Sequence, residues 1–460
     1  MYQIDFKKPQ NVHFIGIGGI SMSGLAEILF DEGFQVSGSD MNKSALTEAL
    51  EEKGIRVDYG QRASNIRDDV DVVVYTAAIH PDNPEFKAAK EKGIPMMARA
   101  DLLGEMMRNY KHAVNISGTH GKTTTTSMLS EILLAAETDP TITVGGILPA
   151  IGGNIRVGGP EIFVAEACEY TNSFLSFFPT MEIILNIEAD HLDFFKDLED
   201  IRHSFRLFAQ KLDEKGILII NRDIERMEEI TEGLPCRVIT FGANPAECTY
   251  SAADIAFDEL ARPSYTLMVE GKPQETITLG VPGMHNVYNS LSAIAAAIEL
   301  GIPMEKIQAG LLHFTGTNRR FEKKGEIGGV TVIDDYAHHP QEIKATLTTA
   351  KNYPHKKLWC VFQPHTYTRT AALLDDFVQA LQEADEVILA DIYAAREVNT
   401  IGISSEDIAK RILAAGGKAH YIPSFDDIET FILENCVPGD LLITMGAGDI
   451  VKVGEKLLGM

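Results

Sequence analysis

Residues 112–136, HAVNISGTHGKTTTTSMLSEILLAA, decide the fold of this 460-residue chain. The apolar run 113–116 is typical of a buried β-strand, and residues 124–135 have the pattern of a helix. The glycine-rich loop between them directs backbone N–H groups at the β-phosphate of a nucleoside triphosphate. Lys122 can reach the β- and γ-phosphate oxygens, and the Thr123 hydroxyl can bind Mg²⁺. The sequence therefore predicts an ATP site formed by Gly118, Thr119, His120, Gly121, Lys122, Thr123 and Thr124.

This loop departs from the usual phosphate-binding pattern GxxxxGK[ST], because Ile116 stands where the first glycine belongs. A chance Gly-Lys-Thr at the start of a helix is the competing interpretation. Strand, loop and helix agree with one another here, and that agreement favours a phosphate loop.

Two further apolar runs end in acidic residues, as a Mg²⁺ site beside a phosphate loop requires. The run EIFVAEA reaches Glu166, and the run starting at Met181 is followed by Asn186, Glu188, Asp190, His191 and Asp193. A solvated strand end and a structural histidine are the ordinary alternatives. Acids and a histidine together at two strand ends favour a metal site.

An earlier glycine loop, residues 16–24, also follows an apolar strand and opens a helix. Such a loop suits a nucleotide diphosphate, and Asp40 lies where an acidic residue usually accepts a ribose hydroxyl. Ser21 stands where the third glycine of the GxGxxG fingerprint belongs, so the loop matches an NAD site only imperfectly. A plain tight turn is the other interpretation. An NAD-dependent dehydrogenase would leave the second loop without a role. The diphosphate-binding candidates are Gly16, Gly18, Gly19, Ser21 and Asp40.

Strand-like runs alternate with helical stretches along the whole chain, which predicts an α/β fold with parallel sheets. We expect three domains, because one core does not grow beyond about 250–300 residues. The predicted ranges are 1–105, 106–316 and 317–460.

The formal charge of −25 argues against binding to nucleic acid or to an anionic membrane surface. Five scattered cysteines show no CxxC pair, so neither a disulfide framework nor a zinc site is indicated. No signal segment or membrane span is evident, and we expect a cytoplasmic protein.

The motifs together resemble those of the Mur ligases of peptidoglycan synthesis. In order, they are GIGGISMSGLA (16–26), GTHGKTTTT (118–126), NIEADHLD (186–193), PGMHNVYN (282–289), GTNRRFE (316–322), DDYAHHPQE (334–342) and QPHTYTRT (363–370). The resemblance implies a Rossmann-like N-terminal domain for a UDP-sugar, a central P-loop-type ATPase domain, and a Rossmann-like C-terminal domain that closes over the site. It implies ATP and Mg²⁺ as cofactors, and UDP-N-acetylmuramate and L-alanine as substrates of a monomer or weak homodimer. The first glycine loop would then hold the UDP diphosphate and not NAD.

The resemblance also implies roles for individual residues. Lys122, Arg319, Asp335 and His338 are expected to be catalytic, and Thr123, Glu166 and His191 to hold the metal. His285 and Asn286 are expected near the adenosine, and His365 and Arg369 near the sugar nucleotide or the amino acid. Arg320, Asp334, Tyr336 and His339 belong to the same motifs. Each has an ordinary alternative; His338 and His339, for example, could simply cap the helix that begins at Pro340.

One segment departs from the family pattern AEADESDASFL. Here residues 165–175 are AEACEYTNSFL, so Glu166 is kept, while Cys168 replaces an aspartate. Cys168 is either a reactive thiol near the site or a buried spectator.

A carboxylate resists attack by an amine until phosphorylation gives it a good leaving group. The predicted reaction is therefore phosphoryl transfer from ATP to a carboxylate, attack by an amine on the acyl phosphate, and release of ADP and phosphate. A histidine or aspartate of residues 334–339 is a candidate general base. A recycling ligase that attaches a peptide to the same sugar nucleotide would share most of these motifs.

Overall fold

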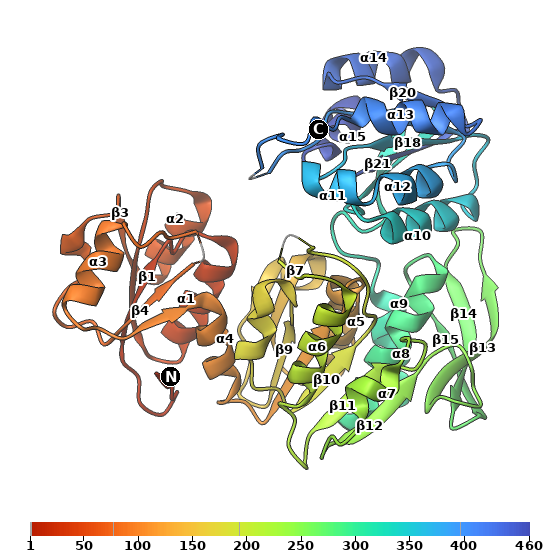
Figure 1. Ribbon diagram of the computed structural model, residues 1–460. Helices are drawn as coiled ribbons and strands as arrows, with labels where there is room; N and C mark the ends of the chain where they lie inside the picture. The colour runs from red at the N-terminus through yellow and green to blue at the C-terminus, as the bar shows by residue number, and fades with distance from the viewer. Residues whose placement is uncertain (1, 77, 193, 396) are drawn as a thin grey trace.

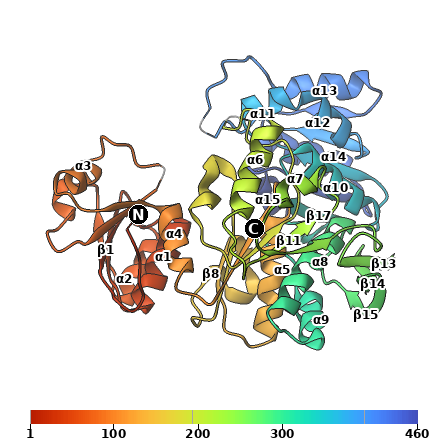
Figure 2. The same cartoon turned by 60° about the horizontal axis from the view of Figure 1, so that its bottom comes forward.

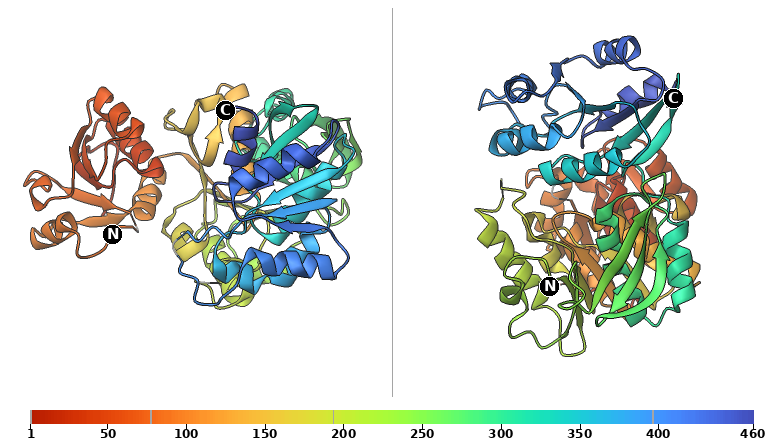
Figure 3. Two further views of the ribbon diagram at one scale, coloured as in Figure 1. Left: turned by 90° about the horizontal axis from the view of Figure 1, so that it is seen from above. Right: turned by 90° about the vertical axis from the view of Figure 1, so that its right-hand side faces the viewer.

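The computed structural model describes residues 2–76, 78–192, 194–395 and 397–460. It has three α/β units, each built on its own sheet (Figure 1). The N-terminal unit lies at one side of the central unit, and the C-terminal unit covers another part of it (Figure 1). Figure 2 and the left view of Figure 3 show the N-terminal unit apart from the rest, and the right view of Figure 3 shows the C-terminal unit above the central one. Within the described residues, no helix is long and apolar enough to cross a membrane.

The described part of the N-terminal unit has a five-stranded parallel sheet in the order β3-β2-β1-β4-β5. The chain winds outward from β1 in both directions, so the glycine loop after β1 lies at the point where the strand order reverses. This is where open α/β sheets bind ligands. Its elements are β1 (Asn11–Ile15), α1 (Ile20–Asp31), β2 (Gln35–Asp40), α2 (Ala45–Lys53), β3 (Arg56–Tyr59), η1 (Ala63–Asn65), β4 (Val72–Tyr75), α3 (Pro84–Glu91), β5 (Met96–Ala98) and α4 (Arg99–Met107).

The central unit has a ten-stranded sheet among its described residues, in the order β15-β14-β13-β12-β11-β10-β6-β9-β7-β8. Strand β6 lies between β10 and β9, so the phosphate loop after β6 is flanked by the carboxyl ends of both neighbours. The elements are β6 (His112–Ser117), α5 (Lys122–Ala135), β7 (Thr141–Leu148), η2 (Pro149–Ile151), β8 (Gly153–Arg156), β9 (Ile162–Glu166), η3 (Tyr170–Ser176), β10 (Met181–Ile184), α6 (Leu198–Ala209), β11 (Ile217–Asn221), α7 (Met227–Thr231), β12 (Arg237–Phe241), β13 (Tyr250–Phe257), β14 (Pro263–Val269), β15 (Lys272–Thr278), α8 (Met284–Glu299) and α9 (Met304–His313).

The C-terminal unit has a six-stranded sheet in the described residues, ordered β16-β17-β21-β18-β19-β20. All its pairs are parallel except that of β16 with β17, an antiparallel edge that the sequence pattern did not predict. The elements are β16 (Glu322–Ile327), β17 (Val330–Asp335), α10 (Pro340–Lys351), β18 (Leu358–Phe362), α11 (Tyr367–Ala372), α12 (Leu374–Leu381), β19 (Glu386–Leu389), α13 (Ser405–Ala414), β20 (Ala419–Tyr421), α14 (Phe425–Asn435), β21 (Leu441–Met445) and α15 (Val451–Leu457).

Strand β6 shows why these apolar runs become central strands. Its side chains alternate between two faces, so Ala113 packs into one hydrophobic cluster and Val114 and Ile116 into another. Both faces are covered by helices or neighbouring structure, which is why the run is almost continuously apolar. The predicted α/β fold with three domains is therefore confirmed.

Candidate functional site

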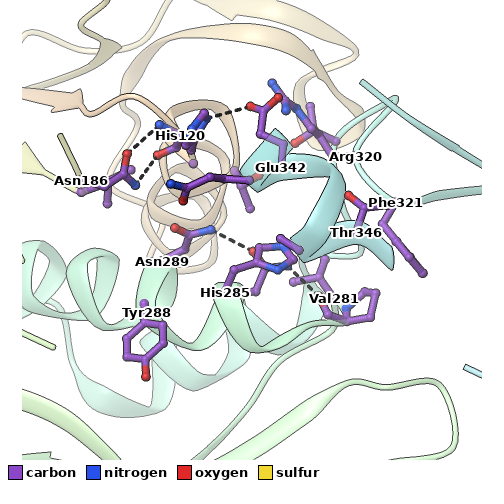
Figure 4. Close-up of a pocket in the computed structure, with 18 of the residues that line it drawn as sticks. His120, Asn186, Val281, His285, Tyr288, Asn289, Arg320, Phe321, Glu342 and Thr346 are labelled. Atoms are coloured by element: carbon purple, nitrogen blue, oxygen red, sulfur yellow. Dashed lines mark hydrogen bonds and ion pairs between the residues drawn. The ribbon is translucent and has the colours of Figure 1, made fainter. Parts of the chain in front are cut away.

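The phosphate loop is held in an open conformation by its glycines and by one asparagine. Gly118 and Gly121 have φ angles of +138° and +86°, which disfavour any residue with a Cβ. A Cβ at Gly121 would also lie 2.7 Å from Asn289 Oδ1. Asn186 clamps the loop, because the backbone N–H of His120 donates to its Oδ1 (2.8 Å) and its Nδ2 donates to the His120 carbonyl (3.0 Å), as Figure 4 shows.

Lys122 begins helix α5 with its ammonium group folded back over the loop. The ammonium donates to the carbonyl oxygens of Gly118 and Thr119, the latter at 3.1 Å, and pairs with Glu169 Oε2 at 3.1 Å. Burial disfavours the charge of Lys122, but the combined attraction of Glu169 and the other acidic groups around it outweighs burial and raises the pKa of the ammonium above its ordinary value. The Lys122 ammonium is therefore charged at neutral pH and lies at the place predicted for the triphosphate.

Thr123 and Glu166 come together beside the loop. Thr123 Oγ1 donates to Glu166 Oε2 at 3.2 Å, and the Gly145 N–H donates to the other carboxylate oxygen. Burial raises the pKa of Glu166. A hydroxyl and a buried carboxylate oxygen are ligands that Mg²⁺ accepts, so these two residues fit the ion. His191 contacts other partners, described below, and Asp193 lies outside the described residues.

A cavity opens next to the loop, between the central and C-terminal units (Figure 4). His120, Gly121 and Thr124 line it, and so does His285, whose pKa burial lowers to about 4. Asn286 is fixed by a hydrogen bond from its Nδ2 to the Pro282 carbonyl (2.7 Å). The other lining residues include Leu185, Asn221, Phe241, Val281, Tyr288, Asn289, Arg320, Phe321, Asp335, Glu342 and Thr346.

Arg319 and Arg320 have different surroundings. The Arg319 guanidinium is fully engaged within the C-terminal unit, because it donates to Asp334 Oδ2 (2.9 Å) and to the backbone carbonyls of Gly446 and Gly448. Arg320 lines the cavity, stacks over Tyr336 at 5.3 Å, and forms no ion pair with a described residue. Of the two, Arg320 is the cation that faces this cavity.

Asp335 accepts hydrogen bonds that fix the start of the C-terminal unit. The N–H groups of Phe321 and Ala337 donate to it at 3.0 and 2.8 Å, and Thr346 Oγ1 donates at 3.1 Å. Burial raises the pKa of the Asp335 carboxyl to about 6.

The two adjacent histidines, His338 and His339, also have different surroundings. His339 caps α10, since its Nδ1 accepts from the Gln341 N–H at 3.4 Å, which confirms the ordinary alternative for that residue. His338 Nδ1 lies 3.0 Å from the Tyr336 carbonyl oxygen, which fixes the proton on Nδ1 and leaves Nε2 as an acceptor. Burial lowers the pKa of His338 to about 4, so its imidazole is neutral at neutral pH.

A second cavity lies between the central and C-terminal units, around Arg369. Arg369 Nη2 pairs with Asp190 Oδ1 at 3.0 Å, and Arg369 Nη1 lies 3.4 Å from His365 Nδ1. Burial disfavours the Asp190 charge, but Arg369 together with His191 and His339 outweighs burial and holds the pKa of Asp190 well below its usual range. His191 also lines this cavity and stacks on Tyr170 at 4.5 Å. The structure thus brings together His191, His365 and Arg369 from two units.

The first glycine loop is shaped by its surroundings in the N-terminal unit. Asp40 Oδ2 accepts from the Gly18 N–H at 2.9 Å, and a Cβ at Gly18 would lie 2.8 Å from that oxygen. Gly16 has φ +83°, and Gly19 is the residue before α1. Ser21 Oγ accepts from Arg99 Nη1 at 3.0 Å. Asp40 therefore supports the loop itself, and Arg99 brings a cation to it.

Three residues of these sites were not among the predicted site residues. Glu169, the buried partner of Lys122, sits in the segment that departs from the family pattern. Arg99 begins α4 far along the chain from the loop it faces, and Glu342 reaches His120 from the C-terminal unit at 3.1 Å. None carries a local signal, because each depends on tertiary contact. Cys168, also in the altered segment, is exposed, and its carbonyl accepts from Ser173 Oγ at 3.0 Å.

Comparison with known proteins agrees with this architecture. Three family models match consecutive parts of the chain: the Mur ligase family catalytic domain (residues 11–111), the Mur ligase middle domain (116–297) and the Mur ligase glutamate ligase domain (319–448).

Full-length relatives are also found. The chain is 65% identical to the UDP-N-acetylmuramate–L-alanine ligase of Lachnospira eligens and 60% identical to that of Agathobacter rectalis, over 100% of each chain. The crystal structure of UDP-N-acetylmuramate-alanine ligase from Thermotoga maritima superposes with a TM-score of 0.79 at 30% identity, covering 98% of both chains. A murein peptide ligase from Psychrobacter arcticus gives a TM-score of 0.68 at 25% identity, again over 98% of both chains. On these grounds the chain belongs to the Mur ligase family of ATP-dependent ligases.

Proposed function

We propose that this enzyme joins L-alanine to the carboxylate of UDP-N-acetylmuramate, with hydrolysis of ATP to ADP and phosphate, in peptidoglycan precursor synthesis. The observation that carries the proposal is 65% identity over the full chain to a relative that bears this activity in its name. The site geometry supports it independently, because an ATP-type loop faces a cavity that a second unit closes.

In the proposed mechanism, the loop residues 118–124 hold the triphosphate by their backbone N–H groups. The Lys122 ammonium exchanges its carbonyl partners for phosphate oxygens, and Arg320 supplies a second cation from the opposite unit. Thr123 and Glu166 would hold Mg²⁺, with His191 as a further predicted ligand. A Mg²⁺ ion held by these residues would supply positive charge for the phosphoryl oxygens during transfer.

The γ-phosphoryl group moves to the sugar carboxylate, and the amine of alanine attacks the acyl phosphate. The amine must lose a proton, and the His338 Nε2 is an acceptor near the Arg369 cavity, with the rings of His338 and His365 5.9 Å apart. We assign Arg319 and Asp335 to positioning, because their side chains form hydrogen bonds within the segment that begins the C-terminal unit.

The proposal assigns a task to each predicted domain. Residues 1–105 hold the sugar nucleotide at Gly16, Gly18, Gly19 and Ser21, with Arg99 as a cation for the diphosphate. Residues 106–316 bind ATP, with His285 and Asn286 near the adenosine. Residues 317–460 close over both and present His365 and Arg369 to the substrates. We place the reaction in the cytoplasm, where ATP is supplied, and expect a monomer or weak homodimer.

A recycling ligase that attaches a peptide to the same sugar nucleotide is the second candidate. The structure of the murein peptide ligase favours it, since that protein shares the fold over almost the whole chain. Its 25% identity is far below the 65% of the alanine ligase, which makes it the weaker candidate. A dehydrogenase gains no support, because the family models and the full-length relatives reported above are all ligases.

The test is ADP release measured with UDP-N-acetylmuramate and a panel of amines: L-alanine, glycine, L-serine and a tripeptide. We expect release that requires both substrates and is fastest with L-alanine. Preference for the tripeptide would assign the recycling reaction, and release without any amine would contradict ligation.

A further inference from the structure

Three buried polar atoms with no hydrogen-bond partner converge between the phosphate loop and the C-terminal unit. They are His120 Nε2, Glu188 Oε2 and His339 Nε2. One donor atom from each of these residues lies within 4.8 Å of the other two. His339 is only 5% exposed, and no described residue forms a hydrogen bond with its Nε2. His120 Nε2 and Glu188 Oε2 form an ion pair at 3.3 Å without an aligned hydrogen bond, whereas His339 Nε2 faces them without a partner among the described residues. A buried unpaired nitrogen is costly, and its position beside two further potential ligands indicates a missing ligand.

We propose that His120, Glu188 and His339 form a binding site for a divalent transition metal such as Zn²⁺. Two imidazoles and one carboxylate are a donor set that Zn²⁺ accepts, with a fourth position left for water. The proposed Mg²⁺ site is different, since it is built from Thr123 and Glu166. Zinc–ligand bonds of about 2.0–2.2 Å bring donor atoms within roughly 4 Å of one another, so binding draws these side chains slightly together.

The surroundings orient the ligands as metal sites require. Glu342 Oε1 lies 3.1 Å from His120 Nδ1 and holds a ring proton there, so Nε2 is the nitrogen that faces Glu188 and His339. Burial disfavours the charged ring, but Glu188 and Glu342 outweigh burial and raise the pKa of His120 to about 9, so a metal on Nε2 displaces a proton. The same Glu342 carboxylate accepts from the His339 N–H at 3.3 Å. Thr119 Oγ1 accepts from the Glu188 N–H at 2.9 Å and fixes the third ligand. One carboxylate thus organises both histidines.

Binding has one local cost. The His339 Nδ1 accepts from the Gln341 N–H at 3.4 Å, and a metal on Nε2 moves the ring proton to Nδ1 and breaks this contact. At 3.4 Å the bond is beyond the usual 2.7–3.2 Å range, so the loss is small. His120 Nε2 and Glu188 Oε2 form an ion pair at 3.3 Å, and a metal between them replaces the shared proton while it keeps both atoms as ligands.

The consequence concerns domain movement. His120 and Glu188 belong to the central unit, and His339 belongs to the C-terminal unit. A metal held by all three would tie the two units in the closed arrangement and would slow each step that needs them to separate. Transition metals bound at this site should therefore inhibit the enzyme.

The test is a Co²⁺ titration of the full chain, without substrates and with excess Mg²⁺ to occupy oxygen-rich sites. We expect one Co²⁺ per chain with the strong visible absorption of a four-coordinate site, displaced by Zn²⁺. His339→Gln and Glu188→Gln should abolish this spectrum, and Glu342→Gln should weaken binding by roughly 10–100-fold. The control His313→Gln, at the exposed end of α9, should bind like the wild type.

X-ray absorption of the Zn²⁺-loaded wild type makes the test independent of whether a variant folds. Two imidazoles in the first shell support the site, and fewer than two overturn it. A wild type that shows only the weak spectrum of hydrated Co²⁺, or a folded His339→Gln that binds as tightly as the wild type, also overturns it. None of these readouts depends on the proposed substrate, so the ligase activity can fail or hold separately.

Discussion

The central unit contacts its two neighbours in opposite ways. Toward the N-terminal unit the contact is apolar: Phe6 lies edge-on to Tyr110 at 5.9 Å, and one buried cluster runs from the N-terminal sheet onto a face of the central sheet. Toward the C-terminal unit it is ionic, through His120 with Glu342 and Arg369 with Asp190. In the described residues, no buried hydrophobic cluster joins residues before 315 to residues after 329.

The difference matches the work that each interface does. Separation of an apolar interface exposes its side chains to water at a cost in free energy. The N-terminal and central units should therefore stay together through the reaction. Ion pairs regain hydration when they separate, so the C-terminal unit can leave and return with small changes in free energy. Both cavities lie at this ionic interface, which is where closure has to exclude water.

The apolar interface should break most severely at Gly104. A Cβ there would lie 2.0 Å from the Ser176 carbonyl oxygen, because α4 packs directly against η3. Gly104→Ala should lower the free energy of unfolding by about 2–3 kcal/mol, measured by urea denaturation. Gly153→Ala, where a Cβ meets nothing within 4 Å, is the control. Equal stability of both variants would mean that this interface is loose.

At the ionic interface, Arg369→Gln should lower kcat and leave the free energy of unfolding almost unchanged. The substitution leaves Asp190 without its partner in the closed state, at a cost of roughly 2 kcal/mol or about 30-fold in kcat. Opening of the units rehydrates Asp190, so the urea midpoint should change little. Arg156→Gln, which loses an exposed pair with Asp139, should alter neither quantity. A large stability loss for Arg369→Gln would place the pair in a permanent core.

The smallest effect should come from a buried glutamate on an apolar face of the central sheet. Glu182 projects from β10 on the same side as Ile184, is fully buried, and neither of its carboxylate oxygens has a partner. Burial raises the pKa of Glu182 well above its ordinary 4.5, although Lys211 opposes the shift. The folded protein therefore keeps a proton that the unfolded chain releases. Its stabilising effect is complete below pH 4.5 and is lost as the pH rises through the raised pKa.

Glu182→Gln should thus gain roughly 1 kcal/mol of unfolding free energy at pH 8 relative to the wild type, and less at pH 5. Urea denaturation at the two pH values measures this difference. The exposed Glu275→Gln on β15 serves as the control. A gain that does not depend on pH would show that Glu182 is charged in the folded state.

Local pattern predicted the phosphate loop and the strands around it, because residues 112–136 carry their own signal for strand, turn and helix. It also placed Thr123 and Glu166 together, since the ends of adjacent parallel strands share one edge. Period alone could not reveal the antiparallel strand β16 or the short hairpin of β7 and β8. Those depend on edges that the apolar pattern does not mark.

Pairs that come from different units were beyond sequence reasoning. Nothing near Lys122 identifies Glu169 as its partner, and nothing near His120 points to Glu342, more than 200 residues away. The choice between Arg319 and Arg320 as the residue facing the nucleotide cavity likewise needed the structure. The predicted catalytic and metal roles remain predictions for the experiments above.

Activation of a carboxylate by ATP at the Gly118–Thr124 loop is the central claim, and oxygen transfer tests it most directly. UDP-N-acetylmuramate with ¹⁸O in both carboxylate oxygens is turned over with ATP and L-alanine, and the phosphate is analysed by ³¹P NMR. The acyl phosphate loses its carboxyl C–O bond when the amine attacks, so each phosphate should carry one ¹⁸O. Phosphate without ¹⁸O would contradict the account.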